Sequence, residues 1–223
     1  MKEKSMMRKQ LITVLMGGLC LWLCGISAAG ELIIYPSDDT FVNNLQPNTV
    51  NGNRGDLATR YLNQNGSILR SYLKFDLSAI PADQSIVGAV LHLTYSLYIN
   101  DPVVGAYYLE NDSWSENTLT WNNAPTNFNI SATDTQLISI INGNGEFLWT
   151  VTPDVAHSYE ADDIYSVVLK LTNETQVSDA DFFSKECGLP GRLPYLQIEY
   201  QPVPEPATLL LIGLGAVIAA RRR

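Results

Sequence analysis

The chain has few cysteines and histidines and none of the common catalytic motifs. Cys20 and Cys24 lie in the first thirty residues, so Cys187 stands alone in the rest and no intrachain disulfide can form there. We expect Cys187 to be a small packing residue. His92 and His157 have no Cys or His at metal-ligand spacing. No GxSxG, HExxH or phosphate-binding glycine loop is present, so we predict that the protein is not an enzyme.

Positive charge is scarce in the central part of the chain, residues 30–201. The terminal segments hold seven of the 14 Lys and Arg residues but only two of the 23 acidic residues. The central 172 residues therefore carry seven cations and 21 anions, a formal net charge of −14. Such an acidic surface repels a phosphate backbone, which excludes nucleic acid as a partner, and it suits a secreted protein that uses calcium. The length fits one domain with a sizeable core.

Residues 1–29 are predicted to be a secretory signal peptide. Four basic residues in the first ten precede the apolar run LITVLMGGLCLWLCGI. Ser27 and Ala29 are the small residues that signal peptidase needs for cleavage before Gly30. The alternative is a retained membrane anchor, for which the apolar run is short.

The C-terminal end has three parts in a fixed order. These are Pro204, Glu205 and Pro206, then 14 apolar residues from 207 to 220, then Arg221, Arg222 and Arg223. As a helix the apolar part would span only ~21 Å of a ~30 Å hydrocarbon core, so it is a short transmembrane segment that anchors poorly. The arrangement resembles the PEP-CTERM sorting signal of Gram-negative bacteria. The resemblance implies recognition by an exosortase, removal of the tail, and delivery to the cell surface or extracellular matrix; the alternative is a simple tail anchor.

Apolar and polar residues alternate along much of the central part. In SILRSYLKFDLS, the apolar side chains from Leu69 to Phe75 share one face and Arg70, Tyr72 and Lys74 share the other. AVLHLTYSLYI alternates in the same way, and IYSVVLKLT and LPYLQIEY are typical of later strands. Turns rich in Gly, Asn and Pro separate these segments, and no amphipathic helix of three turns is evident. We predict an all-β fold, an antiparallel two-sheet β-sandwich of the jelly-roll type.

Four segments together are similar to the DNRLRE domain, also called carbohydrate-binding module family 96. They are YPSDDTFVNN, SYLKFDLSAIPADQSIVGAVLHLTY, DSWSENTLTWNNAP and FFSKECGLPGRLPYLQIEY, which span nearly all of residues 31–200. The resemblance implies a β-sandwich without catalytic activity of its own. Such domains often accompany polysaccharide-active enzymes, and some bind alginate. No enzyme domain accompanies this one, so the resemblance leaves its ligand open.

The segment ENDSWSENTLTWNNAP, residues 110–125, raises three readings. Asp112 and Glu116 suggest a glycosidase pair, which needs two carboxylates ~5 Å or ~6.5–9.5 Å apart. However, Asp112 is typical of a turn, and Glu116 is expected to begin the next strand. We interpret Trp114 as a side chain packed under that turn. A sugar-contacting rim and a catalytic pair are the alternatives.

Arg70, Tyr72 and Lys74 are the predicted glycan-binding residues. Successive residues on one strand face lie ~7 Å apart, a spacing comparable to a sugar unit. Two cations on an acidic domain favour charge-assisted bonds to an acidic polysaccharide such as alginate, and the tyrosine ring would offer a stacking surface. The alternative is a solvated strand face whose cations pair with acids such as Asp76.

A calcium site is predicted from the loop oxygens of Asp39, Asn51, Asn53 and Asp56. Calcium takes six to eight oxygen ligands, often from flexible loops. The pattern is not an EF-hand, and Asn-Gly pairs are also ordinary turn residues, so a simple loop is the alternative.

Together these features predict a secreted, exosortase-sorted carbohydrate-binding protein without catalytic activity. Its expected location is the bacterial cell surface or extracellular polysaccharide matrix. The alternative is a structural matrix or adhesion protein whose domain binds no glycan. A basic or aromatic groove on the sheet would favour the first function, and a uniformly acidic surface the second.

Overall fold

The computed structural model describes residues 29–203, except residue 64 and residues 140–144. The predicted signal peptide and all six residues of the predicted sorting signal fall outside this range, apart from Ala29 at the boundary. The strands are β1 (Gly30–Ile34), β2 (Asp38–Asn43), β3 (Asp56–Leu62), β4 (Ser67–Asp76), β5 (Gln84–Ile99), β6 (Val103–Tyr108), β7 (Asp134–Leu137), β8 (Glu146–Thr150), β9 (Ile164–Leu171), β10 (Ser178–Phe183) and β11 (Tyr195–Pro202). The helices are α2 (Thr152–Ala161) and the short 3-10 helix η1 (Pro190–Arg192).

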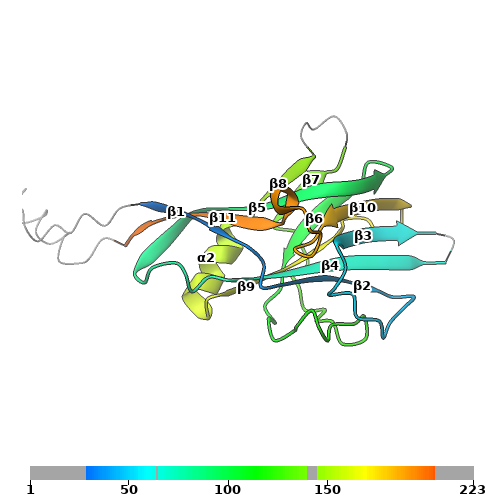
Figure 1. Ribbon diagram of the computed structural model, residues 1–223, viewed down its shortest axis with the longest axis horizontal. Helices are drawn as coiled ribbons and strands as arrows, with labels where there is room; N and C mark the ends of the chain where they lie inside the picture. Colours follow the sequence, from blue (N-terminus) through cyan, green and yellow to red (C-terminus); the bar gives the residue numbers. More distant parts are fainter. Residues whose placement is uncertain (1–28, 64, 140–144, 204–223) are drawn as a thin grey trace, which may run out of the picture. The chain divides into compact units, whose positions relative to one another are not determined.

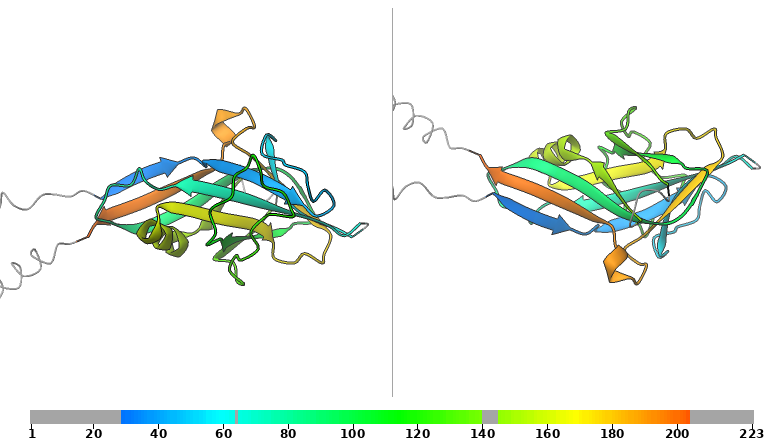
Figure 2. Two further views of the ribbon diagram at one scale, coloured as in Figure 1. Left: turned by 90° about the horizontal axis from the view of Figure 1, so that it is seen from below. Right: turned by 90° about the horizontal axis from the view of Figure 1, so that it is seen from above.

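Hydrogen bonds join the described strands into a single eleven-stranded sheet. The order is β1-β11-β5-β10-β3-β4-β9-β6-β7, and in addition β2 pairs with β4 and β8 pairs with β5 (Figure 1). The sheet curls around its own interior, as the two views in Figure 2 show. The structure is mostly β, as predicted, and the strand pairs are antiparallel as expected. The two-sheet jelly roll is not confirmed, because the ladder is continuous.

The long strand β5 turns the sheet from one half to the other. Its Val90–Thr94 part pairs with β8, and its Tyr95–Ile99 part pairs with β10. The register between β5 and β10 shifts between Tyr95 and Leu97, which leaves one extra residue on β5. Such a bulge bends a strand and interrupts the alternation of its side chains. Strict alternation would place Leu97 on the same face as the buried Leu91 and Leu93, but Leu97 is accordingly 47% exposed.

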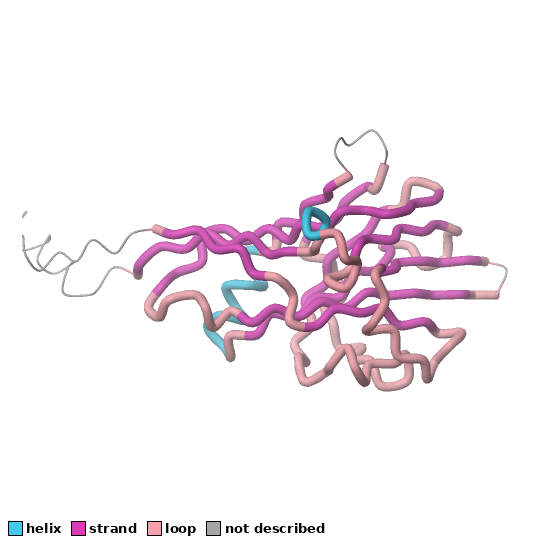
Figure 3. Tube along the Cα trace, viewed as in Figure 1, coloured by secondary structure: helices cyan, strands magenta, loops and turns pink. Residues whose placement is uncertain are grey.

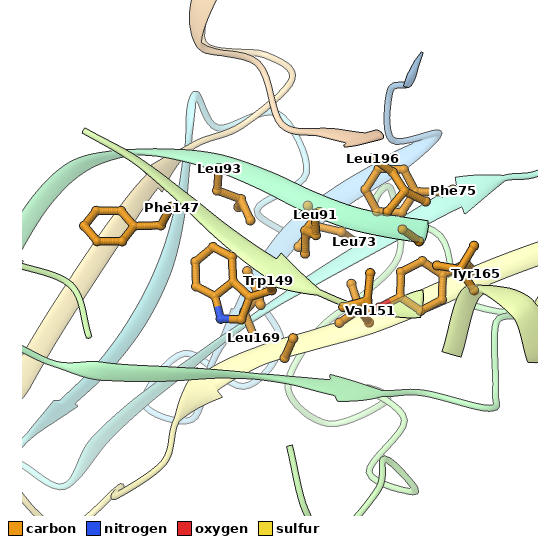
Figure 4. Packing of buried hydrophobic residues seen from close by; sticks show 14 of the residues in the cluster. Leu73, Phe75, Leu91, Leu93, Phe147, Trp149, Val151, Tyr165, Leu169 and Leu196 are labelled. Carbon is orange, nitrogen blue, oxygen red and sulfur yellow. The ribbon is translucent and has the colours of Figure 1, made fainter. Parts of the chain in front are cut away.

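The main core lies in the interior of the curled sheet (Figure 4). The sequence builds it from the alternating apolar residues of β4, β5 and β9, to which β8 and β11 add theirs. Trp149 on β8 is fully buried, and its indole Nε1 donates a hydrogen bond to the carbonyl oxygen of Val104 at 3.0 Å. The largest fully buried side chains include Trp149, Tyr72, Tyr165, Phe75, Phe182 and Leu57.

The helix α2 was not predicted from the sequence. Its buried residues are Asp154, Val155 and Ser158, so two of the three are polar and the apolar periodicity is weak. A proline in the first turn favours the helix start. The buried Asp154 is held by the hydroxyl of Thr133, which donates to its Oδ2. The helix packs on β5 and β9 and closes one side of the core.

Candidate functional site

The strands β10, β3, β4 and β2 lie next to one another in the sheet (Figure 1). Residues of these strands and of the loop between β2 and β3 line a polar pocket. Its volume is about 250 Å³. This is just below the ~300–1,000 Å³ typical of pockets for drug-sized ligands, so it suits one small polar unit. The lining residues are Phe41, Asn43, Gln46, Asn51, Arg54, Asp56, Ala58, Arg60, Leu69 and Asp181.

The floor of the pocket is apolar. Phe41, Ala58 and Leu69 form a small buried cluster separate from the main core. Strand pairing brings them together, because Leu69 of β4 lies between Asn43 of β2 and Arg60 of β3 in the ladder. Alternation along β3 then sends Leu57 to the core and its neighbour Ala58 to the pocket. The result is an apolar patch at the base of a polar rim.

Arg54 and Asp56 form the outer rim of the pocket. The guanidinium of Arg54 donates to both carboxylate oxygens of Asp56, at 3.0 and 3.3 Å. It also lies over the ring of Phe41, 5.5 Å from the ring centre. The Arg54 side chain is nevertheless 56% exposed, so its remaining donors face solvent. Gln46 is likewise exposed at the rim.

Arg60 and Asp181 form the inner wall, and Asp179 lies behind them outside the pocket lining. Arg60 Nε lies 2.8 Å from Asp179 Oδ2, and its Nη2 donates to Asp181 Oδ2 at 3.3 Å. Both contacts follow from β3 pairing with β10, where Arg60 stands opposite Asp179. Burial, reinforced by the adjacent Asp179 charge, raises the pKa of Asp181 to about 7. Protonation of this wall therefore changes near neutral pH.

The raised pKa of Asp181 predicts that the domain loses stability as pH rises. Between the ordinary pKa of 3.8 and about 7, the folded state holds a proton that the unfolded state has released. This contribution is complete below the ordinary value and lost above about 7, with a slope of up to ~1.4 kcal/mol per pH unit. Urea unfolding from pH 4 to 8 should show a flatter profile in Asp181→Asn than in the wild type, because the variant lacks this carboxyl group while Asp39, whose pKa is also raised, still contributes in both. The exposed Glu160→Gln is the control, and an unchanged slope in Asp181→Asn would contradict the prediction.

The three predicted glycan-binding residues share one face of β4, but that face is covered. Tyr72 is only 1% exposed, so its ring is not an open stacking surface. Arg70 donates to both carboxylate oxygens of Glu174 at 2.8 Å, and Lys74 lies 3.7 Å from Asp38. The pairing of these cations with acids agrees with one part of the alternative, although the partners are not Asp76, but the face is covered and not solvated as that alternative stated. Their role toward a glycan stays a prediction.

The cover is the long segment between β6 and β7, drawn as loop in Figure 3. Each of the three predicted glycan-binding residues contacts this cover. The Arg70 guanidinium lies over Trp121, 5.2 Å from the ring centre. Tyr72 Oη donates to the carbonyl oxygen of Pro125 at 3.1 Å. Lys74 donates to the carbonyl oxygen of Trp114 and lies 4.6 Å from the centre of its ring.

Residues 110–125 contain no strand, so the expectation that Glu116 begins one is wrong. The interpretation of Trp114 is confirmed, because this side chain is 6% exposed and packs in a second core cluster. The buried members of that cluster are Val42, Tyr72, Tyr107, Leu109, Trp114, Leu119 and Val168. The segment therefore folds as an ordered cover on the outer face of the sheet.

Three of the four predicted calcium ligands separate into two places, and the fourth, Asn53, is exposed and belongs to neither. Asn51 and Asp56 line the pocket, where Asn51 Nδ2 donates to the carbonyl oxygen of Phe41 at 3.0 Å. Asp39 is buried and lies beside Glu116 and Glu186, with one oxygen of each within 4.8 Å of the others. Burial raises the pKa of Asp39 to about 8. Calcium itself stays a prediction.

Amides, guanidiniums and carboxylates around an apolar floor can donate to and accept from the hydroxyl groups of a sugar while its C–H face rests on the floor. A family model for carbohydrate-binding module family 96 matches residues 32–200. The chain belongs to this family. A search of curated proteins found no match for this family 96 chain.

A second model, the PEP-CTERM protein-sorting motif, matches residues 202–223 of the family 96 chain. Both resemblances predicted from the sequence are thereby confirmed. The motif indicates an exosortase-processed protein of the cell envelope or extracellular space. Among the residues that the structure describes, no helix is long and apolar enough to span a membrane.

Sequence reasoning on this family 96 chain missed most of the pocket. Asn43, Gln46, Arg54, Arg60 and Asp181 come from three strands and a loop, and only the sheet order brings them together. One signal was available: Asp56, Ala58 and Arg60 alternate with Leu57 and Thr59 in DLATR, so the acidic and basic ends of that segment share a face. Nothing in the sequence shows that Asp181 lies opposite Ala58.

Proposed function

We propose that this protein binds a carbohydrate in the pocket between β2, β3, β4 and β10, without catalysis, at the bacterial cell surface or in the extracellular polysaccharide matrix. The observation that carries the proposal is the rim of amide and charged side chains around an apolar floor, in a chain of a carbohydrate-binding family. The sorting motif supports the location.

The balance of charge in the pocket favours hydroxyl contacts as the basis of recognition. Two guanidiniums, Arg54 and Arg60, face two lining carboxylates, Asp56 and Asp181, and each arginine is already paired. An acidic polysaccharide such as alginate would have to compete with Asp56 for the exposed Arg54. Acidic glycans therefore belong in the test beside uncharged ones.

The experiment is isothermal titration of the full-length chain in mild detergent with alginate and uncharged glucan oligosaccharides. The variant is Arg54→Ala/Gln46→Ala, in which both altered side chains are exposed, so the fold should persist. We expect at least a tenfold loss of affinity, which is ~1.4 kcal/mol and within the range of one or two lost hydrogen bonds. The matched control is Arg192→Ala, because Arg192 also stacks on a phenylalanine ring, 5.1 Å from the centre of Phe183, but does not line the pocket.

A second variant, Arg70→Ala/Lys74→Ala, tests the strand face predicted from the sequence. This variant should lower the melting temperature because it releases the cover, whereas Arg54→Ala/Gln46→Ala should not. Loss of binding in Arg70→Ala/Lys74→Ala at an unchanged melting temperature, with full binding in the pocket variant, would move the site to the strand face. No heat with any glycan would favour the structural matrix or adhesion protein.

A further inference from the structure

A cluster of three carboxylates joins three segments that are distant in the sequence. Asp39 is on β2, Glu116 is in the cover between β6 and β7, and Glu186 follows β10. One carboxylate oxygen from each lies within 4.8 Å of the other two. Asp39 as a whole residue is 1% exposed. The side chains of Glu116 and Glu186 are 12% and 26% exposed. The cluster is therefore largely withdrawn from bulk water.

The existing bonds leave this cluster with uncompensated negative charge. Lys185 Nζ lies 2.7 Å from Glu116 Oε1 and 2.6 Å from Glu186 Oε1. The amide of Lys185 donates to Asp39 Oδ2 at 2.9 Å, and the amide of Asp39 donates to Glu116 Oε2 at 2.9 Å. One ammonium thus faces three carboxylates.

Asp39 Oδ1 is the unexplained atom. It is buried and accepts no hydrogen bond within the described part of the chain. A buried carboxylate oxygen without a donor is costly unless a cation or a proton occupies its free side. Hydrogen bonds from the backbone amides of Asp39 and Lys185 already hold the carboxylates of Glu116 and Asp39 in place, so the Asp39 carboxylate is fixed beside the two glutamates.

We propose that Asp39, Glu116 and Glu186 bind a calcium ion. Three carboxylates offer three to six hard oxygen ligands, and calcium accepts mono- or bidentate carboxylates in irregular geometry and completes its shell with water. Magnesium demands a near-octahedral shell, and zinc prefers nitrogen and sulfur ligands. This site shares only Asp39 with the set predicted from the loops, and it does not depend on glycan binding.

The ion would connect β2, the cover and the segment after β10 at one point. Glu116 also packs against the loop between β2 and β3, which lines the pocket. Its carbonyl oxygen approaches Gly52 so closely that a Cβ at this glycine would lie only 2.5 Å away. The amide of Glu116 is held by Asp38 Oδ1 at 3.0 Å. Calcium at this position therefore stabilises the packing of the cover against the sheet.

The test uses the full-length chain in mild detergent, stripped with EDTA and titrated with calcium chloride alone. We expect saturable binding in calorimetry and a melting temperature that rises by several degrees, since a ligand of the native state stabilises it. Glu186→Gln keeps the side-chain shape and should lower the calcium affinity at least tenfold, while the exposed Glu160→Gln should not. Potassium chloride at equal ionic strength controls for charge screening.

Lys185→Met separates a metal site from a plain ion-pair cluster. Removing the competing ammonium should raise calcium affinity at least tenfold and make the variant less stable than wild type in EDTA, with calcium restoring the melting temperature. The proposal is overturned if calcium raises the melting temperature of neither the wild type nor Lys185→Met, or raises it no more than potassium does. In that case a shared proton neutralises the cluster. Equal calcium binding by wild type and Glu186→Gln would also overturn it.

Discussion

Replacing Trp149 with alanine is expected to lower the free energy of unfolding by ~3–5 kcal/mol, the range for truncating a buried tryptophan. The side chain is 0% exposed and packs edge-on against Phe182, with ring centres 5.7 Å apart. Its loss opens a large cavity and removes the hydrogen bond to the carbonyl oxygen of Val104. Since the net stability of a domain is only ~5–15 kcal/mol, this variant should be close to unfolding at ambient temperature.

The control for this change is its neighbour on the same strand. Leu148 is 45% exposed, so Leu148→Ala should cost less than ~1 kcal/mol. Urea unfolding followed by far-ultraviolet circular dichroism measures both. Similar losses in the two variants would contradict the position of β8 in the curled sheet.

Trp114→Ala is expected to cost ~3 kcal/mol, at the lower end of the range for a buried tryptophan. This side chain anchors the cover: its ring lies 5.9 Å from that of Tyr72 at an interplanar angle of 72°. Lys74 would also lose the ring below its ammonium group. The cover should loosen before the sheet does, because the main core contains no part of it.

Limited proteolysis distinguishes this local effect from global unfolding. In Trp114→Ala, cleavage within residues 110–132 should accelerate at temperatures where far-ultraviolet circular dichroism is still native. Trp121→Ala is the matched control, since Trp121 is only partly buried against the same cluster and its loss should have a smaller effect. A loss of glycan binding in Trp114→Ala with no change in stability or proteolysis would instead indicate a sugar-contacting rim.

Alternation predicted the strands of this fold well where both faces have distinct environments. SILRSYLKFDLS became β4: on one face Leu73 and Phe75 joined the main core and Leu69 the pocket floor, and the other face became the layer under the cover. Alternation does not predict that the outer face of β4 is buried. The covering segment is irregular, and only tertiary contacts determine where it lies on β4. For that reason Tyr72 was expected in solvent and is found in a core.

The candidate site was less predictable than the fold. Charged residues such as Arg60 and Asp181 look like ordinary surface residues in the sequence, and only the pairing of β3 with β10 makes them neighbours. The carboxylate cluster shows the same limitation. Asp39 was identified as a candidate ligand, but the acids beside it are 77 and 147 positions further along the chain. Both the pocket and the carboxylate cluster depend on how distant segments pair, and the pattern of a single sequence does not encode this pairing.

The position of β11 affects how the domain would carry a mechanical load. This last strand is not at an edge: β1 and β5 flank it, and its pairing with β1 runs from Tyr200 opposite Gly30 to Leu196 opposite Ile34. A protein tethered through the chain that follows β11, and pulled through a glycan held in the pocket, would load these ladders lengthwise. Hydrogen bonds on both sides of β11 would then have to shear together instead of unzipping one at a time.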